Sequence, residues 1–135
     1  MTSTTTDGVT VSVYVSYVPE YSNPLSSEYC FQYRVHIDNH NDFPVRILRR
    51  EWELFDSQLN SAHRSCYRST GGKGVGMGIQ PLIEGGADYE YSGSVKQSSD
   101  LGSMHGTYLV EHGHTGELLE IRIPRVPLVG PCRTN

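Results

Sequence analysis

Hydrophobic and polar residues alternate with a period of two along most of the chain, which is the pattern of half-buried β-strands. In residues 9–16, valine occupies every odd position and a polar residue or tyrosine every even one. The clearest stretch has one apolar and one polar face, formed respectively by Tyr29, Phe31, Tyr33, Val35 and Ile37, and by Cys30, Gln32, Arg34, His36 and Asp38. No window has a sustained helical period, so the pattern predicts strands throughout.

Weaker alternation predicts further strands at 45–55, 62–69, 87–95, 104–111 and 117–123. The alternation slips between Ile47 and Leu48, which indicates a β-bulge. Pro124 and Pro127 are expected to end regular pairing, so that the last segment lies along the domain without forming a strand. About seven short strands joined by turn-rich segments predict an all-β, antiparallel immunoglobulin-like β-sandwich.

The 135 residues suit one domain. Residues 9–128 are expected to form the sandwich. The Ser/Thr-rich residues 1–8 are expected to be a flexible tail, and residues 129–135 a C-terminal tail. No apolar run approaches the roughly 18 residues of a membrane helix, so no membrane span is expected.

The formal net charge of −4 disfavours a general binder of phosphate backbones. The middle of the chain is nevertheless locally basic, with Arg46, Arg49, Arg50, Arg64 and Arg68 followed by Lys73. These arginines are candidates for an RNA contact. The alternative is a solvated strand face whose charges pair locally.

The three cysteines, Cys30, Cys66 and Cys132, include no C-x-x-C pair, which argues against a disulfide framework and a zinc ribbon. The first residues have neither a basic region nor an apolar stretch, so no secretory signal is expected. A cytoplasmic location follows from both observations. A mitochondrial location is the alternative if a leader is cleaved from a longer precursor.

A glycine-rich loop is the strongest candidate for chemistry, and its candidate anion-binding residues are Gly72, Lys73, Gly74, Val75, Gly76 and Gly78. Successive glycines let backbone N–H groups converge on an anion, and Lys73 adds positive charge. No register matches the G-x-G-x-x-G or Walker pattern, and no helix is expected to follow. The alternative is a mobile connection between strands.

Histidines and aspartates alternate at His36, Asp38, His40 and Asp42, and imidazole with carboxylate can ligate a metal. Residues 39–42 have the composition of a turn, which breaks the common face, so we predict no metal site and no cofactor. His112 and His114 lack a third ligand. We also find no catalytic set, because G-x-S-x-G is absent. The single tryptophan, Trp52, is expected to fill the core.

Several motifs in order resemble the ApaG domain family. They are V-x-V-x-V from Val9 with Tyr21 and Pro24, F-x-Y-x-V-x-I-x-N from Phe31, V-x-I-L-x-R-x-W from Val45, the glycine loop ending in Gln80-Pro81, Gly86 with Tyr91-x-Gly93, G-S-M-x-G-x-Y from Gly102, and Ile123-Pro124 with Pro127-Leu128. The resemblance spans most of the chain. Arg50-x-Trp52, Gln-Pro after the glycines and G-S-M-x-G-x-Y are its specific parts.

The resemblance implies a fibronectin-III-like sandwich with no established enzyme activity. It associates bacterial members with cobalt and magnesium resistance and with diadenosine tetraphosphate metabolism, and eukaryotic versions with interaction modules of F-box and DNA-polymerase-δ-interacting proteins. The family's glycine loop resembles a pyrophosphate-binding motif. Here that loop is one residue longer, and Lys73 stands where an acidic or polar residue is usual.

Three functions follow as expectations. The first is a non-catalytic protein-interaction module, a subunit or adaptor in a larger protein or ribonucleoprotein assembly. The second is a pyrophosphate or dinucleotide sensor that uses the glycine loop. The third is an indirect role in divalent-cation balance. A homodimer formed through an edge strand is also plausible, because exposed sheet edges need covering.

Overall fold

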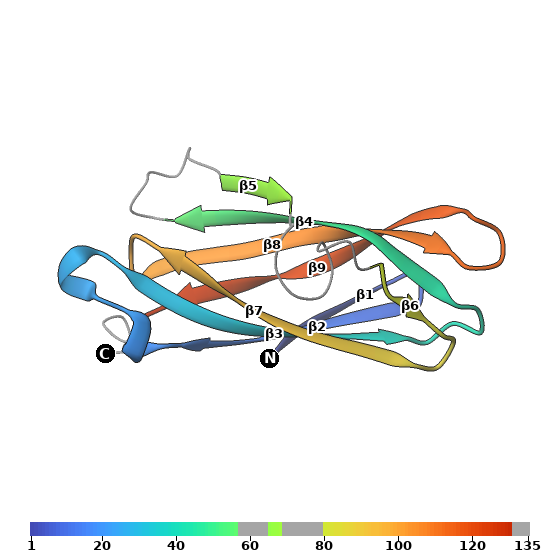
Figure 1. The fold of residues 1–135 in the computed structure, drawn as a ribbon, viewed down its shortest axis with the longest axis horizontal. Coiled ribbons are helices and arrows are strands. Elements are labelled where there is room, and N and C mark those ends of the chain that lie inside the picture. The colour runs from blue at the N-terminus through green and yellow to red at the C-terminus, as the bar shows by residue number, and fades with distance from the viewer. Residues whose placement is uncertain (57–64, 69–79, 131–135) are drawn as a thin grey trace.

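The computed structural model describes residues 1–56, 65–68 and 80–130, and in it two β-sheets pack face to face (Figure 1). The strands are β1 (Thr2–Thr6), β2 (Val9–Tyr17), β3 (Tyr29–Asn39), β4 (Val45–Asp56), β5 (Ser65–Arg68), β6 (Leu82–Ile83), β7 (Asp88–Gln97), β8 (Leu101–His112) and β9 (Leu118–Val129). Two 3₁₀ turns, η1 (Pro19–Tyr21) and η2 (Pro24–Ser26), connect β2 to β3. In the described part of the chain, no helix is long and apolar enough to cross a membrane.

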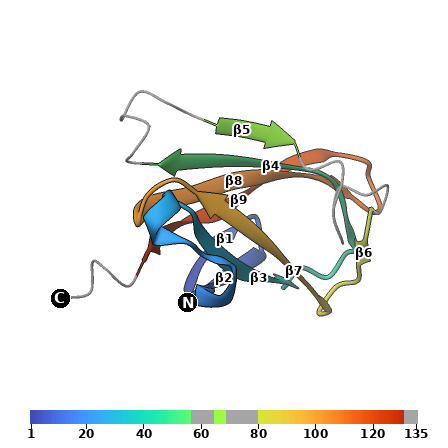
Figure 2. The same ribbon diagram turned by 60° about the vertical axis from the view of Figure 1, so that its left-hand side comes forward.

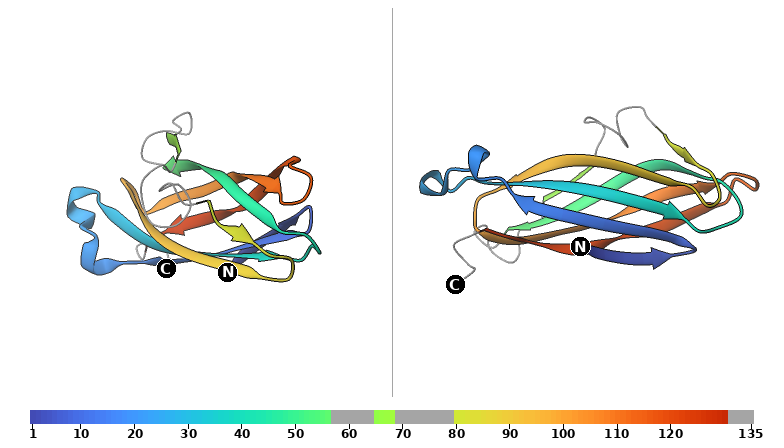
Figure 3. Two further views of the ribbon diagram at one scale, coloured as in Figure 1. Left: turned by 45° about the vertical axis from the view of Figure 1, so that its right-hand side comes forward. Right: turned by 90° about the horizontal axis from the view of Figure 1, so that it is seen from below.

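Every strand pair is antiparallel. The first sheet has the order β1-β2-β3-β7, and the second has the order β5-β4-β8-β9 with β6 paired to β4. Figures 2 and 3 show the two sheets as separate layers, and in Figure 3 η1 and η2 project at one end of the sandwich. This confirms the predicted all-β, antiparallel sandwich.

The inner faces of the two sheets form one continuous core. The odd-numbered residues of β2 and β3 supply one layer, and Val11 and Val35 are completely buried. Trp52 on β4 is 2% exposed and lies with its ring 5.6 Å from that of Tyr33, which confirms that tryptophan fills the core. The period-two alternation read from the sequence therefore separates core from surface on these strands.

The predicted β-bulge in β4 is confirmed, because its register with β8 shifts between Ile47 and Arg49. One extra residue on a strand reverses which side chains face inward beyond it. Val45 and Ile47 are buried before the shift, whereas Arg50 and Trp52 are buried after it. The bulge thus places an arginine on the core face.

Two expectations at the chain ends were wrong. Residues Thr2–Thr6 do not form a flexible tail but pair with Val9–Val13 as β1. Pro124 and Pro127 do not end β9, which pairs with β8 as far as Val129. A proline is tolerated there because β9 is the last strand of its sheet and the register shifts opposite residues 104–106, where pairing is already interrupted.

Asn39 fixes the register between β3 and β7. Its side-chain amide is buried and donates to the carbonyl groups of Phe43, Ile83 and Glu84 at 2.8–3.3 Å. Its backbone N–H donates to the carbonyl of Ala87, and its carbonyl accepts from the N–H of Gly86. Gly86 has a φ of +81°, which favours glycine. The turn before β7 is therefore tied to the end of β3, so that Asp38 faces Asp88.

Candidate functional site

The outer face of the first sheet is polar along its three long strands except at Cys30. It presents Thr10, Ser12, Tyr14 and Ser16 from β2, Gln32, Arg34, His36 and Asp38 from β3, and Asp88, Glu90, Ser92, Ser94 and Lys96 from β7. These side chains share a face because each strand alternates and the registers are regular. Tyrosine, serine and glutamine gather in the middle of this face beside Arg34, and the other charges lie toward its ends.

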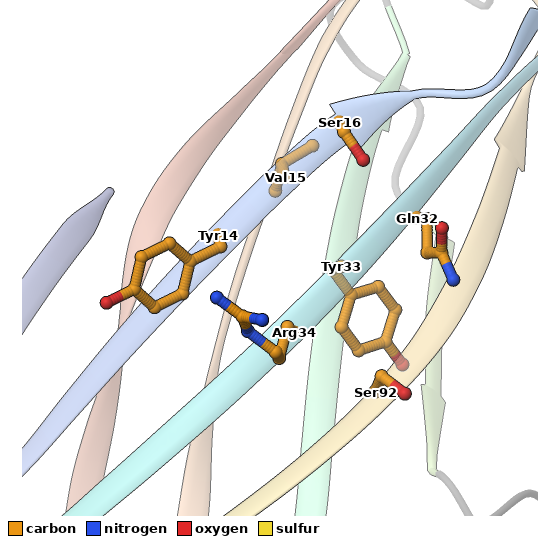
Figure 4. A pocket seen from close by; sticks show the side chains of 7 residues that line it. All are labelled: Tyr14, Val15, Ser16, Gln32, Tyr33, Arg34 and Ser92. Carbon is orange, nitrogen blue, oxygen red and sulfur yellow. The ribbon is translucent and has the colours of Figure 1, made fainter.

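Two hollows meet in the middle of this face and form what we call the sheet groove. One has a volume of about 390 Å³ and is lined by Tyr14, Val15, Ser16, Gln32, Tyr33, Arg34 and Ser92 (Figure 4). The other, of about 500 Å³, is lined by Val18, Tyr21, Cys30, Gln32, Ser92, Gly93, Ser94 and Lys96. They share Gln32 and Ser92, so one groove crosses β2, β3 and β7. It is hollow because serine and glycine stand beside much larger side chains.

Arg34 forms one wall of the sheet groove. Its guanidinium carbon lies 4.7 Å from the centre of the Tyr14 ring, and its Nε lies 3.7 Å from Glu90 Oε2. Its side chain is still 55% exposed. A guanidinium stacked on a ring keeps its N–H groups in plane and available to acceptors. The Arg34 guanidinium is thus held in one orientation in the absence of a ligand.

A histidine and three carboxylates occupy the end of the same face, and we call them the His36 cluster. His36 Nε2 lies 2.8 Å from Asp88 Oδ2 and 3.4 Å from Asp38 Oδ1, and His36 Nδ1 lies 3.7 Å from Glu90 Oε2. His40 and Asp42 follow the end of β3, as the turn composition predicts. The sequence pattern does not indicate Asp88 and Glu90 as members of the cluster, because they lie about 50 positions away and only the β3–β7 register brings them to His36.

The second sheet carries a simpler pair on its outer face. His105 Nε2 lies 2.9 Å from Glu53 Oε2, across the β4–β8 register. At the end of that sheet, His112 stacks on Phe43 with ring centres 3.7 Å apart, and its Nδ1 accepts from the backbone N–H of His114. These contacts give His105 a structural role in pairing β4 with β8 and give His112 a structural role in the β8–β9 hairpin.

Arg50 lies in the core, at 5% exposure, and not on an exposed basic face as expected. Its guanidinium is 5.0 Å from the Tyr91 ring centre and 5.7 Å from that of Trp52. The Tyr91 and Tyr108 hydroxyl groups hydrogen-bond to each other and join the two sheets. The bulge described above is the reason that this arginine points inward.

Burial dominates the ionisation of this interior cluster. Loss of solvent raises the pKa of Tyr91 to about 12, although the Arg50 charge opposes the shift. Burial likewise raises the pKa of Tyr108 well above its ordinary value. Burial alone would lower the pKa of Arg50, but its interactions with Tyr91 outweigh that effect and raise it. Arg50 therefore stays charged and the two tyrosines stay neutral at physiological pH.

Arg46 and Arg49, the other arginines of the basic segment whose side chains the structure describes, do not share the buried face of Arg50. Arg46 donates from Nη1 to the carbonyl of Gln80 at 2.9 Å, and Arg49 Nε lies 3.5 Å from Glu51 Oε1. For Arg68 the structure describes the backbone pairing with Glu51, and Arg64 lies outside the described residues. An RNA contact through Arg46, Arg49, Arg64 and Arg68 stays a prediction, and the buried Arg50 no longer belongs to it.

The glycine-loop candidates, residues 72–76 and 78, lie outside the described residues. The chain that follows them is anchored on the β4 bulge. The Ile47 N–H donates to the carbonyl of Pro81, and Gln80 Nε2 lies 3.5 Å from the carbonyl of Leu48. This anchoring gives the Gln80-Pro81 motif a structural role. The anion-loop hypothesis stays a prediction, and calorimetry of pyrophosphate against Lys73→Ala and Gly74→Val tests it.

The fold and the site together define a small antiparallel β-sandwich with a polar groove and a histidine–carboxylate cluster on one outer face. The ApaG domain family model matches residues 19–112. The chain therefore belongs to the ApaG domain family, as its motifs indicated.

Curated relatives match over nearly their whole length. Protein ApaG of Proteus mirabilis is 33% identical over 131 residues, which cover 97% of this chain and 98% of that protein. Protein ApaG of Sinorhizobium fredii is 34% identical, covering 93% of this chain and 91% of that protein. The crystal structure of the putative ApaA protein from Bordetella pertussis superposes with a TM-score of 0.79 at 34% identity, covering 91% of this chain and 94% of that one.

Proposed function

We propose that this chain is a non-catalytic protein-interaction module, a subunit or adaptor of a larger assembly, and that the sheet groove is its contact surface. The observation that carries the proposal is the composition of the groove. Tyrosine, serine and Gln32 cover its middle, and tyrosine and serine are enriched in the binding loops of antibodies. Tyrosine supplies a large, rigid contact area, and serine and glutamine supply adaptable hydrogen bonds.

The strands that carry the sheet groove, and its shallow form, support this function. The groove lies on three long, regular strands whose other face is the core, so its side chains are held by rigid elements. Its shallow form, open along β2, β3 and β7, suits an extended polypeptide segment better than a small molecule, which usually binds in an enclosed apolar cavity. Arg34 adds a donor that can bind a carboxylate or a backbone carbonyl.

The contacts of the described histidines support the non-catalytic part of the proposal. His36 and His105 face carboxylates, and His112 caps the backbone of its own hairpin. A nucleophilic mechanism instead pairs a histidine with a serine or cysteine. Cys30, a cysteine on the groove strands, is 8% exposed.

The test is affinity purification of tagged chain from its own cells, comparing Ser92→Arg with Thr107→Arg. Ser92→Arg fills the centre of the groove with a bulky cation. Thr107→Arg makes the same change of charge and size on the outer face of the second sheet. We expect wild type and Thr107→Arg to co-purify the same stoichiometric partner and Ser92→Arg to lose it. Retention by Ser92→Arg of a partner that Thr107→Arg loses would move the contact surface to the second sheet.

A further inference from the structure

The His36 cluster has the geometry of a cation site. His36 and Asp38 are two residues apart on β3 and so share a face, and the register places Glu90 opposite His36 and Asp88 opposite Asp38. One ligand atom from each of His36, Asp38 and Asp88 lies within 4.8 Å of the others. A small cation with bonds of about 2.0–2.2 Å holds neighbouring ligand atoms roughly 3–3.5 Å apart. The observed separation of 3.4 Å lies in that range, and the separation of 2.8 Å is slightly shorter.

The charges of the cluster favour a cation between the side chains. Asp38 and Asp88 face each other directly across the strands, and like charges in that position destabilise a sheet. Arg34 compensates one of the three carboxylates through Glu90. With a neutral imidazole the cluster remains negative, and a divalent cation would remove the repulsion.

The surroundings of the two His36 ring nitrogens are a second, independent observation that favours a metal. The His36 Nε2 atom is shielded from solvent and has no partner in hydrogen-bond geometry among the described residues, although two carboxylate oxygens lie near it. Its Nδ1 faces Glu90 Oε2 at 3.7 Å. In metal sites the second nitrogen of a ligating imidazole commonly faces a carboxylate, which orients the ring. His36 thus has one nitrogen turned toward the two aspartates and the other toward an orienting group.

We propose that His36, Asp38 and Asp88 form an open site for a divalent first-row transition-metal cation and that Glu90 orients the imidazole. Imidazole suits Zn²⁺, Co²⁺ and Ni²⁺ better than it suits Mg²⁺ or Ca²⁺, and carboxylates complete a nitrogen–oxygen ligand set. The three side chains are 30%, 40% and 59% exposed, so water fills the remaining coordination positions. The site adds a metal-binding activity beyond the proposed protein contact, on the same sheet face.

The test is calorimetric titration of the purified full chain with Co²⁺, together with its thermal unfolding. Wild type binds one Co²⁺ saturably and unfolds at a higher temperature with the metal present. His36→Ala and Asp88→Asn weaken binding roughly tenfold or more, by loss of a ligand. Asp88→Asn also raises the unfolding temperature of the metal-free chain, because it removes the like-charge pair, while abolishing the rise that Co²⁺ causes. A purely structural aspartate would not produce these two opposite shifts.

His105→Ala is the matched control, because His105 also faces a carboxylate across two strands but has one acidic partner at ion-pair distance among the described residues. It binds Co²⁺ as wild type does. Wild type that shows no saturable binding, or His36→Ala and Asp88→Asn that both bind like wild type, would overturn the proposal. Mg²⁺ that binds as tightly as Co²⁺ would overturn the assigned class of metal.

Ser92→Arg separates this inference from the proposed function. It blocks the centre of the sheet groove and changes none of the three proposed metal ligands, so we expect Co²⁺ binding to persist while partner binding is lost. Loss of both activities in Ser92→Arg would show that the two sites are one, which contradicts the proposal of a separate metal site.

Discussion

Two arginines of this chain stack on tyrosines in similar geometry, one inside the sandwich and one on its surface. Arg50 lies 5.0 Å from the Tyr91 ring centre at 5% exposure, and Arg34 lies 4.7 Å from the Tyr14 ring centre with its side chain 55% exposed. The interior pair is locked between two sheets, whereas the surface pair faces open solvent. Burial therefore assigns the interior contact to stability and leaves the surface contact available for the proposed protein contact.

The largest effect is expected from Arg50→Ala. The substitution removes a buried side chain that contacts the Trp52 and Tyr91 rings and leaves a cavity between the sheets. We expect the free energy of unfolding to fall by about 3 kcal/mol. Urea unfolding followed by Trp52 fluorescence measures it. A loss below about 0.5 kcal/mol would contradict the stabilising role of the interior pair.

The second-largest effect is expected from alkaline pH, which should lower the free energy of unfolding by ionising Tyr91. The ordinary pKa of tyrosine is 10.0, and burial raises that of Tyr91 to about 12. Between these values the unfolded chain has released the proton that the folded chain still holds, so the stability contributed by neutral Tyr91 is complete below pH 10 and is lost as pH rises toward 12. The expected loss is on the order of 2–3 kcal/mol. Urea unfolding across this range should show a shallower decline for Tyr91→Phe than for wild type.

Gly93→Ala probes the boundary between the core and the sheet groove. A β-carbon at Gly93 would lie 2.5 Å from the Tyr33 hydroxyl, and Tyr33 both lines the sheet groove and contacts Trp52. The ring must shift, at a cost of about 1 kcal/mol. Ser94→Ala, on the neighbouring outward position, is the control and should unfold within about 0.5 kcal/mol of wild type. Equal stabilities would show that Tyr33 adapts freely.

Arg34→Ala should have the smallest effect on stability. An exposed stack and a 3.7 Å ion pair with Glu90 contribute at most about 1 kcal/mol. The same substitution should abolish partner capture in the affinity purification, because it removes a wall of the sheet groove. A variant that is strongly destabilised but still captures the partner would reverse the assigned roles of the two arginines.

Local alternation in the sequence predicts most of the sandwich, because each long strand has one apolar and one polar face. It does not find β1, since Thr2–Thr6 contains no apolar residue and depends on pairing with β2. It also does not find β6, which has two residues. The prolines of β9 were misjudged because tolerance of proline depends on which strands are edges, and sheet order is not a local property.

The site is less predictable than the fold for a related reason. His36 and Asp38 are adjacent in the alternation and were noticed, but Asp88 joins them through a register set by Asn39 and Gly86. Arg50 was assigned to an exposed face, although its own bulge was predicted at Ile47–Leu48. A one-residue slip reverses a strand face, so an uncertainty of one position in the bulge is enough to exchange core and surface.

The central claim is that the sheet groove is the contact surface, and site-specific photo-crosslinking tests it most directly. A photo-crosslinker is introduced at the position of Tyr14, in the groove, or of Thr107, on the other sheet, and irradiated in the protein's own cells. We expect the position of Tyr14 to crosslink one defined protein and the position of Thr107 to crosslink none. Crosslinking of that protein from the position of Thr107 alone would contradict the account.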